Sequence, residues 1–372
     1  MSNAWNQLWK VSVQSGHAVA VWRLPNQLTK QLIIDESGAR RLAEIDLAVL
    51  PKGFIVAPFE GNPYFLSANH FESIPITATP TAFLEQELLQ PVIDLEQQRY
   101  FTDQVARSVE KIQQGAFQKV VLSRTAEQFF DMHFDVLEAF DRLCVAYPTA
   151  FVCAVYLPDL GNTWLCATPE TLVSQDRAGI FRTISLAGTQ TALHTDGSLM
   201  SVQEVRWSQK EIEEQAYVSR YIIDCFKKIR LREYIENGPK TVLAGNLMHL
   251  KTEYLVDTMR FSYPGLISTM LGLLHPTSAV CGTPKEAAKS WIHAVEKHDR
   301  SLYSGYLGPV QVQEETHLFV NLRTVRLTQQ VDCVQATYFA GCGITEESNP
   351  AKEWQETEMK CQTLQRVLSA SL

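Results

Sequence analysis

The chain has 372 residues, of which 45% are hydrophobic and 20% are charged, as is typical of a globular protein with a sizeable core. The formal net charge of −8 weighs against general nucleic-acid binding, which requires a basic surface. No apolar run approaches the roughly 18 to 20 residues that span a membrane, so we expect neither a nucleic-acid partner nor a membrane partner.

The eight cysteines stand singly in the sequence, and no Cys-x-x-Cys pair occurs. Such spacing favours reduced, buried thiols over a zinc site or a disulfide framework. The first ten residues also lack the apolar stretch of a signal peptide. Both observations lead us to expect a cytoplasmic location.

The N-terminal region is predicted to form short strands and turns, because its apolar runs are broken by Pro, Gly and Asn. The expected strands are 17–24, 31–35, 53–59 and 63–68, and residues 75–91 are expected to form a connection. We therefore divide the chain into a variable, strand-rich region over 1–92 and a larger region over 93–372, joined in one compact unit.

Strand and helix patterns alternate in blocks from residue 97 onward. In the first helix, over 97–114, Phe101, Val105 and Ile112 share one face, and Gly115 ends it. The other helices are expected over 135–147, 208–230, 262–273, 283–297 and 350–368. The strands are expected over 117–130, 150–157, 163–168, 171–175, 179–189, 240–250, 306–313, 316–327 and 331–344. This order indicates an α+β fold, with large, mainly antiparallel sheets in the core and helices on the outside.

Two segments far apart in the chain have the same Lys-Glu-x-x-Glu pattern, at 210–214 and 352–356. On a helix, the lysine and the second glutamate would form a weak surface ion pair. Ser208 and Glu211 also fit a capping box, and Glu353 falls near the start of a helix, where the dipole favours a carboxylate. These structural roles compete with a second interpretation, in which the four glutamates act together.

Three charged residues stand next to or within apolar strand runs, and each has two interpretations. Lys119 in QKVVLSR is either a surface lysine or a base whose pKa is lowered by burial. Glu170 in ATPETLV is either a solvated turn carboxylate or a general acid, and Arg323 in FVNLRTVRL either lines a polar face or binds a carboxylate. The glycines of 187–189 and 340–343 are either plain turns or backbone sites for an anion.

Eight blocks occur in a fixed order: KVVLSR, ATPETLVS, LAGT, KEIEEQ, HPTSAVCGTPKEAA, LYSGYLGPV, VNLRTVRL and FAGCGITEESNPAKEWQETEMK. In this order they resemble the chorismate-utilising enzymes, which include anthranilate, aminodeoxychorismate, isochorismate and salicylate synthases. The resemblance covers about residues 97–370. It implies a fold like that of anthranilate synthase component I, a chorismate-binding catalytic domain over 93–372, and chorismate as the small-molecule substrate.

The resemblance also implies that the two acidic segments converge on one Mg²⁺. Glu214 and Glu356 match direct ligands, and Glu211 and Glu353 match partners that act through water. Mg²⁺ prefers a few carboxylates together with waters and substrate oxygens, whereas four carboxylates without a cation would repel one another. Gln215 stands where many members of the family have His, and we expect it to tune the site.

Substrate contacts follow from the same matches. Tyr303 and Arg323 match a pair that grips a substrate carboxylate, and Lys360 matches another carboxylate contact. The remaining implied contacts are Gly188, Thr189, His275, Gly341 and Gly343.

The residue at position 119 distinguishes the subfamilies, because members that use ammonia typically have Gln where this chain has Lys119. The resemblance implies an isochorismate synthase of the menaquinone or siderophore type, expected to be a monomer. In this reading Lys119 activates a water that adds at C2, and Glu170 protonates the departing C4 hydroxyl. A salicylate synthase, which tends to carry Thr where Ala279 stands, is the alternative, and a non-catalytic binding protein is the second.

Overall fold

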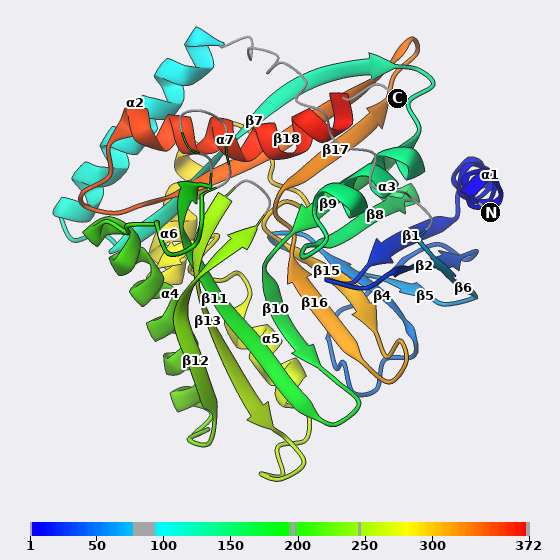
Figure 1. Ribbon diagram of the computed structural model, residues 1–372, viewed down its shortest axis with the longest axis horizontal. Helices are drawn as coiled ribbons and strands as arrows, with labels where there is room; N and C mark the ends of the chain where they lie inside the picture. The colour runs from blue at the N-terminus through cyan, green and yellow to red at the C-terminus, as the bar shows by residue number, and fades with distance from the viewer. Residues whose placement is uncertain are drawn as a thin grey trace.

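The structure is a computed structural model that describes residues 2–76, 94–192, 194, 198, 200–244 and 247–369. Over these residues it has the predicted α+β class, with two nine-stranded antiparallel sheets (Figure 1). In order of pairing, the first sheet contains β14 (Gly282–Thr283), β7 (Lys119–Asp131), β18 (Cys333–Ile344), β17 (Thr324–Gln329), β9 (Asn162–Thr168), β8 (Phe151–Leu157), β1 (Ala18–Arg23), β2 (Thr29–Asp35) and β6 (His70–Pro75). The second sheet contains β12 (Ile235–Ala244), β13 (Leu247–Asp257), β11 (Ile180–Thr191), β10 (Thr171–Gln175), β16 (Thr316–Val320), β15 (Tyr306–Val310), β4 (Gly53–Ala57), β5 (Tyr64–Ser67) and β3 (Arg40–Arg41).

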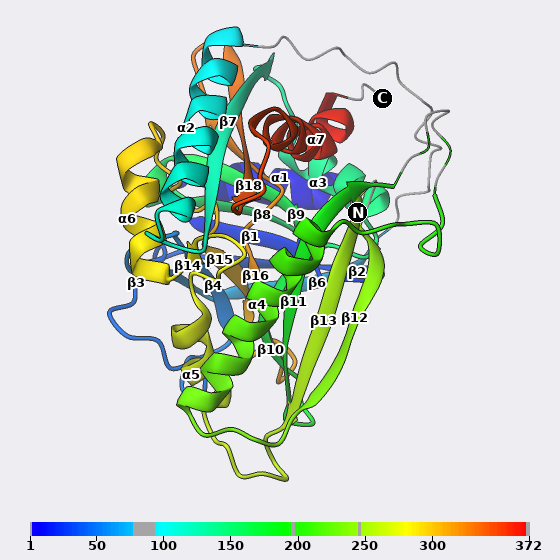
Figure 2. The same cartoon turned by 90° about the vertical axis from the view of Figure 1, so that its left-hand side faces the viewer.

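The helices cover the outer faces of the two sheets (Figures 1 and 2). They are α1 (Ser2–Gln14), α2 (Leu95–Gln113), α3 (Val136–Ala146), α4 (Gln209–Lys228), α5 (Leu266–Leu274), α6 (Lys285–Val295) and α7 (Pro350–Ser369), with a short 3-10 turn η1 (Pro158–Leu160) before β9. The apolar sides of α1, α3 and α7 pack on the first sheet, and those of α4 and α5 pack on the second. None of the described helices combines the length and the apolar character needed to cross a membrane.

The inner faces of the two sheets pack directly against each other. Trp22 of β1 contacts Phe54 of β4 with ring centroids 5.1 Å apart, and Phe151 of β8 stacks on Phe319 of β16 at 4.1 Å. Each pair joins one strand of the first sheet to one strand of the second. Because these strands are buried on both faces, their sequences are continuous apolar runs.

The N-terminal strands complete both sheets. Strand β1 pairs with β8, with Ala20 opposite Val155, and β4 pairs with β15, with Ile55 opposite Gly308. The predicted boundary at residue 92 and most of the predicted connection over 75–91 lie outside the described residues. The division into two regions therefore stays a prediction.

The prediction of short strands and turns over 1–92 is wrong at its start, because Ser2–Gln14 forms α1. Trp5, Trp9 and Ser12 are buried at helical spacing, and the two tryptophans pack against the first sheet. This spacing is present in the sequence, but it covers too few turns to stand out among the strand patterns that follow.

Two segments predicted as single strands are each divided. Residues 240–250 contribute to β12 and β13, which form an antiparallel hairpin that brings Ala244 opposite Leu247. Residues 316–327 contribute to β16 and β17, which belong to different sheets. Arg323, predicted inside a strand, lies between them with a positive φ of 45°.

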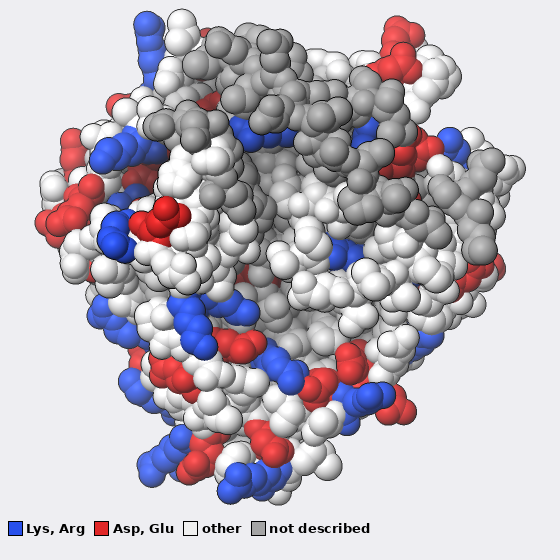
Figure 3. Space-filling view, in the orientation of Figure 1, with Lys and Arg blue, Asp and Glu red and all other residues white. Residues whose placement is uncertain are grey.

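Charged side chains of both signs are mixed on the surface. On the face drawn in Figure 3, lysines and arginines are interspersed with aspartates and glutamates, and the described residues form no continuous basic stripe there. Nucleic acid is bound through such a stripe, so this face offers it no footprint. The expected absence of a nucleic-acid partner stays a prediction.

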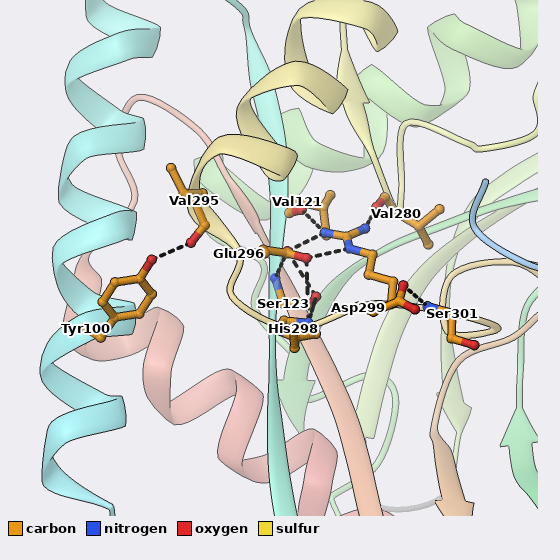
Figure 4. A network of polar contacts seen from close by, with 10 residues as sticks. Tyr100, Val121, Ser123, Val280, Val295, Glu296, His298, Asp299 and Ser301 are labelled. Atoms are coloured by element: carbon orange, nitrogen blue, oxygen red, sulfur yellow. Dashed lines mark hydrogen bonds and ion pairs between the residues drawn. The ribbon is translucent and has the colours of Figure 1, made fainter. Parts of the chain in front are cut away.

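A buried ion pair holds the segment after α6 against β7 (Figure 4). The Arg300 guanidinium donates to both carboxylate oxygens of Glu296, at 2.8 and 2.6 Å, and also to the carbonyl oxygens of Val121 and Val280. Glu296 in turn accepts the backbone N–H of Ser123 in β7 at 2.6 Å. Since the polar atoms of the pair are satisfied at both ends, this network fixes the path of the chain toward Tyr303.

Removing one partner should leave the other buried and unpaired. We expect Glu296→Ala to lower the free energy of unfolding by about 3 to 5 kcal/mol, measured by urea denaturation. The control is Glu286→Ala in α6, whose side chain is 81% exposed, and its loss should stay below about 1 kcal/mol. Equal losses for the two variants would show that the buried pair contributes no more to the free energy of unfolding than an exposed glutamate does.

Candidate active site

Two neighbouring strand pairs cross from one sheet to the other at the same place. Strand β9 of the first sheet continues into β10 of the second, and β16 of the second continues into β17 of the first. Glu170 lies at the first crossing and Arg323 at the second. Backbone hydrogen bonds join the crossings, from Val320 N to Glu170 O and from Ala167 N to Arg323 O, both at 3.0 Å. The fold therefore brings together two charged residues that are distant in the sequence.

Lys119 begins β7 and its side chain is fully buried, which rules out the surface interpretation. Its Nζ lies 3.1 Å from Oε1 of Glu214, which projects from α4. Gly343 of β18 makes this approach possible, because a Cβ at that position would lie 2.3 Å from the same carboxylate oxygen and 2.9 Å from Cε of Lys119. Gly341 has a similar role, since a Cβ there would lie 2.8 Å from the hydroxyl of Tyr303.

Glu170 is buried beside several cations. Burial raises the pKa of its carboxyl to about 7, although the positive charges of Lys119, Arg323 and Lys360 oppose that shift. The environment thus excludes the solvated-turn interpretation. A carboxyl whose pKa is raised in this way keeps its proton closer to neutral pH than an exposed glutamate does, as a general acid requires.

The two Lys-Glu-x-x-Glu segments meet in space. Lys210 of the first segment forms an ion pair with Oε1 of Glu353 in the second, and Lys360 binds Oε1 of Glu356 at 2.6 Å. Glu353 is fully buried, and its Oε2 has no hydrogen-bond partner among the described residues. Burial, and then repulsion by Glu356, raise the pKa of Glu353 while Lys210 opposes the shift. The carboxylates therefore belong to one electrostatic cluster rather than to two separate helix surfaces.

Glu211 differs from the other three glutamates. Its Oε2 accepts the backbone N–H of Ser208 at 2.7 Å and the side-chain amide of Gln190 at 2.9 Å. Glu211 thus closes the capping box that the sequence pattern allows. Its proposed water-mediated contact with a metal stays a prediction.

The donor set fits a divalent cation. The described residues contain no ready-made group of three His, Cys, Asp or Glu side chains spaced for a metal. However, Glu214 and Glu356 are partly accessible, at 14% and 16%, and Glu353 beside them keeps an unpartnered oxygen. Mg²⁺ prefers hard oxygen ligands such as carboxylates. A bound cation would also relieve the repulsion among these carboxylates. Glu214, Glu356 and Glu353 could hold the ion if the lysines that now contact them withdrew.

His249, which sequence reasoning missed, links several predicted substrate residues. One ring nitrogen, Nδ1, lies 2.9 Å from the carbonyl oxygen of Gly188 and 3.4 Å from Oγ1 of Thr189. The other, Nε2, lies 3.4 Å from a guanidinium nitrogen of Arg323. Burial, together with the charge of Arg323, lowers the pKa of His249 to about 3, so the ring is neutral. A neutral ring that donates from Nδ1 to Gly188 presents a lone pair to Arg323 and orients it.

Gln215 fixes α4 against the second sheet. Its side-chain amide donates to Oγ of Ser185 in β11 at 2.8 Å and to Oγ1 of Thr252 in β13 at 3.1 Å. The residue is buried and directly follows Glu214 in the chain. It therefore positions the start of α4, behind the carboxylate cluster.

His275 is not joined to these residues by any described contact. Its ring packs edge-on against Tyr306 at 4.8 Å, and its backbone ends α5. Burial lowers its pKa to about 4. Its predicted contact with the substrate stays a prediction.

A cavity of about 390 Å³ lies elsewhere, between α2, the middle of β7 and the segment after α6. Its lining includes Tyr100, Arg124 and His298 but none of the predicted site residues. The cavity is therefore separate from the candidate site, where lysine and glutamate side chains contact one another.

Comparisons with known proteins agree with this arrangement. A family model described as "Chorismate binding enzyme" matches residues 69–369. Isochorismate synthase of Escherichia coli is 28% identical over 274 residues, which are 73% of this chain and 67% of that protein. A Pseudomonas aeruginosa protein named salicylate biosynthesis isochorismate synthase is 32% identical over 281 residues, 74% of this chain and 56% of that protein.

The fold is also similar to that of solved structures. The solved structure of the menaquinone-specific isochorismate synthase from Escherichia coli superposes with a TM-score of 0.72, covering 96% of this chain and 91% of that one, at 18% identity. The resemblance inferred from the eight sequence blocks is thereby confirmed, and so is the fold class that it implied. The chain belongs to the chorismate binding enzyme family.

Proposed function

We propose that the protein is a Mg²⁺-dependent isochorismate synthase, which converts chorismate to isochorismate. The observation that carries the proposal is the burial of one basic group, Lys119, and one carboxyl of raised pKa, Glu170, within electrostatic reach of each other. An enclosed acid and base suit a reaction in which one hydroxyl is added and another leaves. The names of the relatives support the same reaction.

The cationic groups of the site suit a substrate with two carboxylates. Arg323, oriented by His249, is available to one carboxylate, with the hydroxyl of Tyr303 nearby. Lys360 is held between Glu356 and the carbonyl oxygen of Gly341, which points its ammonium into the same site. These groups bind and orient chorismate in the proposal.

Glu214 and Glu356 would hold Mg²⁺ directly, with Glu353 behind them. The bound ion would supply charge neutralisation and orient the ring carboxylate of the substrate. Glu211 uses Oε2 for the cap of α4 and for Gln190, and we propose that it reaches the ion only through water.

The chemistry then needs two proton transfers. Lys119 takes a proton from a water molecule, whose oxygen bonds to C2 of the ring. Glu170 gives a proton to the hydroxyl that leaves C4 as water, and the ring double bonds shift between these positions. One water enters and one leaves, the enolpyruvyl ether stays intact, and no oxidant or reductant is needed.

The product tests this proposal. With chorismate and Mg²⁺ the protein should form isochorismate, of the same mass as chorismate, and activity should disappear when the metal is chelated. Chromatography with mass spectrometry identifies the product, and a lactate dehydrogenase coupling detects pyruvate. Pyruvate released in step with chorismate loss would identify a salicylate synthase, and an aminated product in ammonium buffer would refute the role of Lys119.

The base is tested by Lys119→Ala. We expect kcat to fall by about 10² to 10⁴-fold, because the proton acceptor is removed, while chorismate still binds through Arg323 and Lys360. Lys227→Ala, on an exposed part of α4, is the matched control and should keep full activity. Near-normal kcat in Lys119→Ala would assign the base elsewhere.

The pH profile tests the acid. Glu170 has a pKa of about 7, so its proton-donating form predominates below pH 7 and is lost as the pH rises through 7. We expect kcat/KM, which reports the free enzyme, to fall toward about tenfold per pH unit on the alkaline side. Glu170→Gln, which cannot donate this proton, should lose most activity together with this slope. A profile that stays flat or rises from pH 7 to 8 would contradict the assignment.

A further inference from the structure

Lys210 and Lys352 occupy the same position in the two Lys-Glu-x-x-Glu segments but have different surroundings. Lys210 reaches across from α4 to α7 and forms an ion pair with Glu353, and 22% of its side chain is exposed. Lys352 is exposed to solvent in the first turn of α7. The sequence repeat therefore contains one lysine that is used in the site and one that is free to serve as its control.

The location of Lys210 is unfavourable for α4 itself. Lys210 lies in the first turn, two residues after the cap residue Ser208, where the helix dipole repels a cation. Its hydrogen bond links the beginnings of the two acidic helices. The ion pair with Glu353, and not the dipole of α4, therefore explains why a lysine stands at this position.

Each of the three glutamates Glu214, Glu353 and Glu356 has its own lysine in the structure. Lys119 pairs with Glu214 at 3.1 Å and Lys360 pairs with Glu356 at 2.6 Å. The third pair joins Lys210 to Glu353, whose carboxylate is fully buried. A buried carboxylate without a cation is costly, so the three lysines neutralise a cluster that would otherwise repel itself.

Lys210 differs from the other two lysines in its reach. The charges of Glu353, Glu356 and Glu214 all act on its ammonium, so Lys210 interacts with the whole cluster and not with Glu353 alone. Its side chain is also the most accessible of the three, at 22% against 14% for Lys360 and 0% for Lys119. A flexible four-carbon stem with a solvent path can leave the site, whereas a fully buried lysine cannot do so without opening the core.

We propose that Lys210 is an internal counter-ion, which occupies the cluster of Glu214, Glu353 and Glu356 before the metal arrives and competes with the divalent cation for the negative charge of that cluster. The inference rests on the proposed metal site. The competition has two consequences: Lys210 stabilises the metal-free protein, and it weakens metal binding, because the ion must displace an ammonium that is already there.

The test compares Lys210→Met with Lys352→Met, using the full chain and Mg²⁺ without chorismate. Methionine keeps the apolar stem and removes the charge. By isothermal titration calorimetry, Lys210→Met should bind Mg²⁺ about tenfold tighter or more than the wild type, and Lys352→Met should match the wild type. The metal-free Lys210→Met protein should also melt about 2 °C lower or more, and Mg²⁺ should restore its stability.

Three results would overturn the counter-ion role. They are unchanged or weaker Mg²⁺ binding by Lys210→Met, equal tightening by both variants, and no Mg²⁺ binding by either wild type or Lys210→Met. Equal tightening would reduce the effect to general surface charge. Wild-type protein that forms isochorismate while Lys210→Met binds Mg²⁺ no more tightly refutes this inference and leaves the proposed reaction standing. Tighter Mg²⁺ binding by Lys210→Met, without isochorismate formation by the wild type, supports the counter-ion role and refutes the proposed reaction.

A second measurement uses the wild-type protein and does not depend on the folding of a variant. A low dose of an amine-acylating reagent, followed by peptide mass spectrometry, reports how accessible each lysine is. Adding Mg²⁺ should release Lys210 and increase its labelling severalfold, with no change at Lys352. Equal labelling of Lys210 with and without Mg²⁺ would contradict the displacement.

Discussion

Strands β9–β10 and β16–β17 run side by side through both sheets, and the positions of the charged groups depend on this shared crossing. An ordinary sandwich of two sheets has an apolar interior and no place for a carboxyl and a guanidinium. At the crossing the ladders are interrupted, which frees Glu170 and Arg323 from strand geometry and directs them to one site. The positive φ of Arg323 is a local departure from preferred backbone geometry, as is common at functional sites.

Charge compensation is the second requirement of this architecture. The site gathers more carboxylates than a protein interior tolerates without cations, and lysines from β7, α4 and α7 provide them. The glycines of β18 leave room for these side chains, since a methyl group at Gly343 would collide with Glu214. In the proposed reaction, binding of a dianionic substrate and a divalent cation would be an exchange of ionic partners in a site where lysines already compensate the carboxylates.

Sequence patterns predicted the fold class and most helices, because alternation and helical periodicity record which faces are buried. They could not show the crossing after β16, since THLFVNLRTVRL keeps one apolar alternation through two strands that belong to different sheets. Family resemblance identified the glutamates, whereas the capping role of Glu211 followed from local spacing alone. His249 was missed because it stands in no distinctive motif, and the pairing of Lys210 with Glu353 was missed because the local pattern pairs Lys210 with Glu214. Their importance comes from neighbours that lie far away in the chain.

Many strands pair with partners that come much later in the sequence, and this has a consequence for how the chain folds. Strand β4 pairs with β15, β9 pairs with β17, and β7 pairs along its whole length with β18, which ends at Ile344. Early strands therefore leave the ribosome long before their partners exist, and both sheets keep open edges until synthesis is nearly complete. Such non-local pairing slows folding and leaves apolar edges exposed to aggregation. The pairing of the strands therefore favours completion of both sheets late in synthesis, after β15 to β18 have been made.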